Sequence, residues 1–259
     1  MTNPKPQMTN RLWIPWLDAL ALAVWGLLML KYWLTGKLNI LIHPAYHWLC
    51  VAGGLGLLAV GGYKIWQLWK QHRRVRREVE ALSESHLTLF PPGWGSMLLL
   101  VAAIAGLSIT PRPFASQTAL EVGVTDLLSA TRSQPQSFRS LKKPEERTLI
   151  DWIRTLNVYP EPDEYTGDRV SVEGFVIHPP EFPKGYMVIS RFVITCCAAD
   201  AYPIGLPVKL PPNSPKYPAD TWLLVQGEMI TETLVDVRKL VIQATQIETI
   251  PEPKNPYDY

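Results

Sequence analysis

The sequence predicts a membrane-anchored α+β protein, in which two or three transmembrane helices at the N-terminus precede a small β domain. Three observations lead to this prediction. The apolar residues are concentrated in the first 110 of the 259 positions. Most of the 24 prolines follow residue 90. Short segments of alternating apolar and polar residues, typical of strands, begin near residue 169. The length also suits two units.

The first predicted span covers residues 12–34. Nearly every residue from Leu12 to Leu30 is apolar, and Trp and Lys residues flank the run, as expected at membrane interfaces. Asp18 interrupts it, and a central carboxylate costs about 2.5–3.5 kcal/mol. Asp18 either reaches the interface or contacts a partner helix or a pathway. A cleaved signal peptide is not expected, because the run is long and no A-x-A site follows it.

A second span is expected at residues 47–69, where five glycines allow close packing against another helix. A third is expected at 94–110, with a re-entrant or interfacial helix as its alternative. Residues 70–77 hold five Lys or Arg residues and predict a cytoplasmic loop at 70–93, in contact with anionic lipid. With three spans, the N-terminus is cytoplasmic and the C-terminal domain extracytoplasmic, in a multi-pass protein of the inner (plasma) membrane.

Several classes of function are not expected. A net charge of +2 does not predict nucleic-acid binding. The sequence lacks a P-loop, a Rossmann glycine pattern, a C-x-x-C pair and an H-E-x-x-H motif. Because no nucleophile with a matching base is recognisable, we do not expect an enzyme.

The composition of residues 111–143 predicts a tether with one short helix near 120–130. An amphipathic helix at 144–156 then opens a domain at 144–250 with five short strands, expected at 169–177, 186–195, 205–210, 221–230 and 239–247. Gly174 and Gly227 lie within strands and permit the bends that a closed sheet needs. We expect an OB-like β-barrel, with a small sandwich as its alternative and a polar tail at 251–259.

Cys196 and Cys197 are adjacent, in a chain with three cysteines, and Asp200 follows three residues later. A soft metal ion such as zinc would suit this set, with His178 as a further candidate ligand. A turn is then required, because adjacent residues of a strand point to opposite faces. The alternatives are a structural pair without chemistry and a redox or vicinal-disulfide role. A second histidine and cysteine group, His43, His47 and Cys50, is a weaker metal candidate.

The segment RFVITCCAADA at 191–201, the segment GFV at 174–176, WLLVQG at 222–227 and IHP at 42–44 together resemble the YcgQ-like family of uncharacterised bacterial membrane proteins. The resemblance covers most of the chain. It implies an accessory subunit of a two-component membrane permease complex, working beside a multi-span permease subunit. Its outward β domain would bind or guard the solute. The alternatives are a stand-alone membrane-anchored metal-handling or thiol-redox protein and a structural assembly factor.

Overall fold

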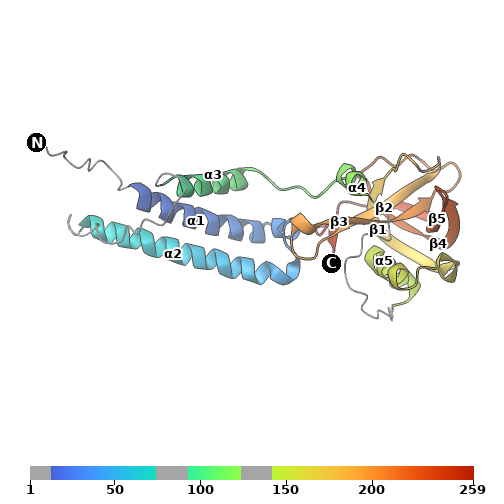
Figure 1. The fold of residues 1–259 in the computed structure, drawn as a ribbon, viewed down its shortest axis with the longest axis horizontal. Coiled ribbons are helices and arrows are strands. Elements are labelled where there is room, and N and C mark those ends of the chain that lie inside the picture. Colours follow the sequence, from blue (N-terminus) through green and yellow to red (C-terminus); the bar gives the residue numbers. More distant parts are fainter. Residues whose placement is uncertain (1–12, 74–92, 124–141) are drawn as a thin grey trace, which may run out of the picture. The chain divides into compact units, whose positions relative to one another are not determined.

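The structure, a computed structural model, describes residues 13–73, 93–123 and 142–259 (Figure 1). The chain divides into two compact units. The helical unit consists of the chain up to Leu38 and of Pro44–Pro111. The β unit consists of Asn39–His43 and Arg112–Tyr259. The short segment Asn39–His43, which lies between two helices in the sequence, therefore belongs to the β unit.

The described residues of the helical unit form the helices α1 (Trp13–Leu34), α2 (His47–Arg73) and α3 (Trp94–Ser108). Among these residues, α1 and the segment Pro44–Lys70, which includes most of α2, are long and apolar enough to cross a membrane, whereas α3 is a shorter apolar helix of 15 residues. These helices lie at the three segments expected from the sequence. Most of the basic cluster at 70–77, and the loop that follows it, lie outside the described residues.

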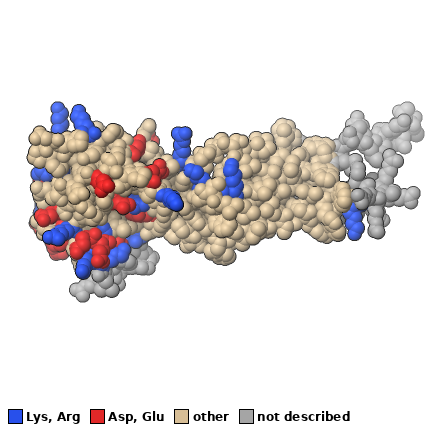
Figure 2. Space-filling model, turned by 180° about the vertical axis from the view of Figure 1, so that it is seen from behind, with Lys and Arg blue, Asp and Glu red and all other residues tan. Residues whose placement is uncertain are grey.

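Glycines let α1 pack closely against α2. A Cβ added to Gly26 would lie 2.7 Å from the carbonyl oxygen of Gly54, and one added to Gly61 would lie 3.2 Å from that of Ala19. Large apolar side chains remain exposed on the other faces, as in Trp48 (69% exposed) and Leu98 (52%). On the face shown in Figure 2, the helical unit carries few charged residues, whereas residues of both signs are frequent on the β unit.

The β unit is built on a six-stranded sheet of β1 (Arg169–Ile177), β2 (Tyr186–Val193), β3 (Tyr202–Lys209), β4 (Trp222–Leu234), β5 (Val237–Thr249) and β6 (Tyr257–Asp258). The strand order is β1-β4-β5-β3-β2-β6. Because β1 also pairs with β2, the pairings of the first five strands return to their starting point. The β3–β5 and β2–β6 pairs are parallel and the others antiparallel.

Two glycines within strands explain how the sheet closes on itself. A Cβ at Gly174 would lie 2.5 Å from the carbonyl oxygen of Ser190, and one at Gly227 would lie 2.1 Å from that of Gln243. Gly227 also marks a register shift between β4 and β5. Since real Cβ atoms do not approach backbone so closely, both positions require glycine, as their place within predicted strands indicates.

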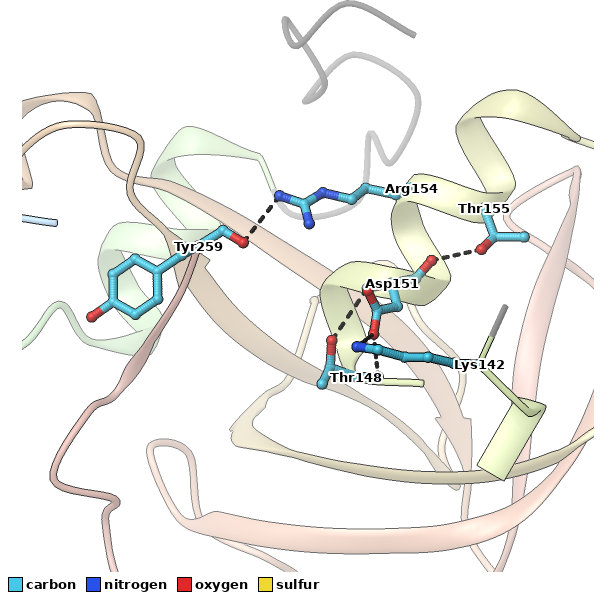
Figure 3. A network of polar contacts seen from close by, with 6 residues as sticks. All are labelled: Lys142, Thr148, Asp151, Arg154, Thr155 and Tyr259. Carbon is cyan, nitrogen blue, oxygen red and sulfur yellow. Dashed lines mark hydrogen bonds and ion pairs between the residues drawn. The ribbon is translucent and has the colours of Figure 1, made fainter. Parts of the chain in front are cut away.

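The helix α5 (Leu149–Val158) packs on the sheet through Leu149, Trp152 and Ile153, which are almost fully buried. A helix was expected from Pro144, but a 3₁₀ turn occupies Pro144–Glu146 and α5 begins after Thr148. The reason is a capping box, in which the Thr148 hydroxyl accepts from the Asp151 N–H and the Asp151 carboxylate accepts from the Thr148 N–H (Figure 3).

The expectation of a polar tail at 251–259 needs correction. β6 pairs with β2, and Tyr257 is 2% exposed within a second apolar cluster that contains Phe175 and Phe192. Phe114 packs against the same cluster. A helix was expected near 120–130, but α4 covers Ser116–Val122. Residues 124–141 of the expected tether lie outside the described residues. The unit that folds around the sheet is therefore longer than 144–250.

The Asp151 carboxylate gives a prediction about acid stability. Burial alone raises its pKa, but hydrogen bonds from Lys142 (2.8 Å) and the Thr148 N–H (3.1 Å) outweigh burial and lower it. Stability from a carboxyl with a lowered folded-state pKa is present above its unfolded value of about 3.9 and is lost as pH falls through the folded value. Asp151→Asn should therefore destabilise the β unit by about 0.5–2 kcal/mol at pH 7 and progressively less toward pH 3.

Hydrogen exchange of β-unit peptides in the full chain measures this difference in the free energy of opening. Glu145→Gln is the matched control, because Glu145 is an exposed acid beside the cap, and its effect should stay within about 0.5 kcal/mol. An Asp151→Asn effect that persists unchanged at pH 3 would contradict the assigned cause.

Candidate metal centre

The two adjacent cysteines lie on a turn that directly follows β2. The chain leaves the sheet after the buried Ile194, bends at Thr195 and Cys196, and forms a 3₁₀ turn over Ala198–Asp200. We call residues 195–200 the cysteine turn. The turn that two thiols need to face one ion is therefore present.

The carboxylate of Asp200 organises the cysteine turn. It accepts hydrogen bonds from the backbone N–H groups of Cys196 (2.9 Å), Cys197 (3.3 Å) and Thr195 (3.3 Å). The Thr195 hydroxyl donates to it as well. Because these donors occupy both carboxylate oxygens, Asp200 acts as a clamp on the backbone of the turn.

The two thiols are close together and accessible. Their sulfur atoms are 3.6 Å apart, Cys196 is exposed, and Cys197 is half-buried. Two metal–sulfur bonds of about 2.3 Å at a tetrahedral angle place the sulfurs roughly 3.8 Å apart. The pair thus already has nearly the spacing that one tetrahedral ion requires. The ligand atoms of Cys196, Cys197 and Asp200 all lie within 4.8 Å of one another.

The segment Asn39–His43 holds the cysteine turn from the other side. Ile42 forms an antiparallel bridge with Cys197. The Ala198 N–H donates to the Leu41 carbonyl (2.8 Å), and the His43 N–H donates to the Cys196 carbonyl (3.0 Å). Sequence reasoning missed this contact, although the IHP segment at 42–44 is part of the family resemblance and is the one signal that singles it out.

The electrostatics of the turn keep one thiol protonated. The Asp200 carboxylate, followed by the Cys197 thiol, raises the pKa of Cys196 to about 11. Burial by itself raises the pKa of Asp200, but hydrogen bonds from Thr195 and Cys196 outweigh it and lower that pKa to about 2. Since the thiolate is the nucleophile in thiol chemistry, this environment disfavours a reactive redox cysteine at Cys196. A metal ion would have to displace the proton.

Of the other candidate ligands, His178, His47 and Cys50 lie away from the cysteine turn, whereas His43 pairs with it. His178 follows β1, where its neighbour Ile177 pairs with Val188 near the start of β2, whereas Cys196 follows the end of β2. Its Nε2 lies 2.8 Å from the Tyr217 carbonyl oxygen. Cys50 and His47 are in α2 of the helical unit. In the described parts of the chain, the cysteine turn is the site where three such ligand atoms meet.

The raised pKa of Cys196 predicts slow alkylation. In the reduced Cys197→Ser chain, Cys196 should react with iodoacetamide much more slowly at pH 8 than an ordinary exposed thiol, because the Asp200 carboxylate still raises its pKa, and the rate should keep climbing with pH above the ordinary thiol pKa. Asp200→Asn in the same background removes the negative charge and should speed the reaction at pH 8. Peptide mass spectrometry follows both rates. Equal rates with and without Asp200 would contradict the conclusion that the Asp200 carboxylate raises the pKa of Cys196.

The comparison with protein families concerns the β unit. Residues 144–259 match the model of the DUF1980 C-terminal domain. A search among curated proteins finds no match. The matched range begins at the turn before α5, includes the cysteine turn and ends after β6, and so it agrees with the structure that the last residues belong to the domain. Over residues 144–259, the β unit of this chain is therefore similar to the C-terminal domain of the DUF1980 family.

Proposed function

We propose that this chain is a membrane-anchored accessory subunit that captures a soft metal ion on its β unit and passes it to a multi-span permease. One observation carries the proposal: two thiols, 3.6 Å apart, lie on an accessible turn whose backbone is clamped before any ion arrives. Thiolate sulfur selects soft or borderline ions such as Zn²⁺ and Cu(I).

The small number of protein ligands suits transfer of a metal ion better than its storage. The oxygens of Asp200 are occupied by hydrogen bonds from the turn, so Cys196 and Cys197 are the main ligands and Asp200 positions them. Structural zinc sites use four protein ligands and are closed. A site with two protein thiolates leaves coordination positions for a ligand of the next carrier, which allows the ion to be exchanged.

The helical unit supplies the membrane anchor in this proposal. Its exposed apolar side chains would cost about 25 cal/mol per Å² in water and nothing comparable in lipid. The basic residues at 70–77 would keep the N-terminus and loop 70–93 cytoplasmic, which places the β unit outside the inner membrane. At 15 residues, α3 is about 22 Å long, below the roughly 30 Å of a bilayer core, so its flanking residues must complete a third span.

The structure of the β unit suits the presentation of the cysteine turn to a partner. The circuit of β1 to β5, with its two glycine-dependent close approaches, supports the interpretation as an OB-like barrel. Such a closed sheet is a rigid base, since each of the strands β1 to β5 has a partner on each side. The cysteine turn then directly follows a strand of this closed sheet and is not part of a long loop.

A largely apolar groove in the helical unit, which also contains ionisable side chains, favours a permease partner. A pocket of about 510 Å³ is lined by Asp18 of α1, Lys64 of α2 and Ser96 of α3, amid apolar side chains. The Ser96 hydroxyl donates to the Asp18 carboxylate. Ionisable groups within spans almost always face other helices or a cavity. A helix of the permease that fills this groove would cover them, and three largely apolar helices offer no solute path alone.

Metal binding is the direct test of the proposed function. The reduced full chain should bind Zn²⁺ at about one ion per chain, and Cys196→Ser with Cys197→Ser should abolish binding. The fold should survive, because Cys196 is exposed and Cys197 only half-buried. Calorimetric titration with metal analysis measures the stoichiometry, and Cys50→Ser is the control that should bind like the native chain. A native chain that binds neither Zn²⁺ nor Cu(I) would reject the proposal.

Reporter fusions test the topology. Alkaline phosphatase fused after residue 115 should be active, because this enzyme works only outside the cytoplasm, whereas a fusion after residue 80, within the basic loop, should be inactive. The reverse pattern, or activity at both points, would show that the three-span orientation is wrong.

A further inference from the structure

We propose that His43 supplies the third protein ligand of the metal site, so that the bound ion joins the segment Asn39–His43 to the cysteine turn. This inference rests on the proposed metal-binding function and adds a residue that lies far from the cysteines in the sequence. The site would then be a Cys₂His set, formed by Cys196, Cys197 and His43, with one position left open.

The backbone pairing places His43 beside Cys196. The two hydrogen bonds from the His43 N–H to the Cys196 carbonyl (3.0 Å) and from the Ala198 N–H to the Leu41 carbonyl (2.8 Å) flank the bridge between Ile42 and Cys197. Because the pairing is antiparallel, the residue after Ile42, which is His43, lies opposite the residue before Cys197, which is Cys196. Directly opposed residues have Cβ atoms about 4.5–5.5 Å apart.

That separation suits ligands of one ion. With metal–nitrogen bonds of about 2.0–2.1 Å and metal–sulfur bonds of about 2.3 Å, an imidazole and a thiolate on opposed residues can reach the same ion. The Asp200 carboxylate is less available, because it accepts the N–H groups of Thr195, Cys196 and Cys197. The nitrogen ligand that a borderline ion such as Zn²⁺ favours is therefore best supplied by His43.

Binding requires a movement of the imidazole. In the structure the ring of His43 packs edge-on against the ring of Tyr259, with centroids 4.6 Å apart. Tyr259 is itself held, since its hydroxyl donates to the Asn255 side chain (2.5 Å) and its carbonyl accepts from Arg154 (3.0 Å). The aromatic ring thus keeps the imidazole in place near the turn, and rotation about its side-chain bonds brings it to the ion.

Metal binding by His43 would affect the connection between the two long helices, α1 and α2. His43 lies nine residues after the end of α1 at Leu34 and four before the start of α2 at His47 in the sequence. An ion held by both segments would pin the connection between these helices to the cysteine turn. Metal occupancy on the β unit would in this way be transmitted to the segment that joins α1 and α2.

X-ray absorption of the zinc-loaded, reduced full chain tests the ligand set without any mutation. We expect two sulfur ligands and the multiple-scattering signature of one imidazole. His43→Ala should remove that signature, keep about one ion per chain and weaken binding by at least the roughly 10-fold that loss of an outer-shell partner costs. His47→Ala and His178→Ala are matched controls that should change neither quantity.

The failures of the two proposals are distinguishable. If the native chain binds zinc through sulfur without an imidazole signature, or if His43→Ala binds as tightly as the native chain, the role of His43 is wrong and the thiol site stands. If the native chain binds neither Zn²⁺ nor Cu(I), the proposed function itself fails.

Discussion

The candidate site depends on the carboxylate of Asp200. Where the chain leaves β2, this one side chain accepts hydrogen bonds from three consecutive backbone N–H groups, those of Thr195, Cys196 and Cys197. Unpaired, those groups would favour alternative conformations of the segment. With the carboxylate in place, the direction of each cysteine is set before any ligand arrives, which is the condition for a site that binds without first having to order itself.

The C-terminal segment stabilises the end of β2, from which the cysteine turn begins. β6 pairs with Phe192 and Val193, the last residues before the chain leaves the sheet. The Arg191 guanidinium lies 3.3 Å from the Asp258 carboxylate, and both side chains are mostly buried. Burial raises the pKa of Asp258, so the nearby guanidinium is what favours its charged form. Removing one partner of such a pair leaves a buried charge unpaired, which makes this segment part of the fold and not an appendage.

Local features of the fold were predictable because their signals are local. Spans appear as apolar runs, strands as alternation, and the glycines at 174 and 227 mark close approaches within predicted strands. The grouping of Asp200 with the cysteines also follows from close spacing in the sequence. The pairing of Ile42 with Cys197 has no local signal, because it joins segments separated by most of the chain. The burial of Tyr257 was missed for a similar reason: prolines and charged residues surround it, and its apolar partners come from β1 and β2.

The exposure of the thiols on a backbone that is held in place favours an exchangeable ion over a permanently bound one. A closed site would bury its ligands and complete a four-ligand shell, as structural zinc sites do. Here Cys196 is exposed, and its pKa of about 11 means that a proton occupies the sulfur until an ion replaces it. Competition between proton and ion lowers the apparent affinity at neutral pH. A clamped backbone with exposed ligands would let an ion both enter and leave without unfolding the turn, as the proposed role in passing on an ion requires.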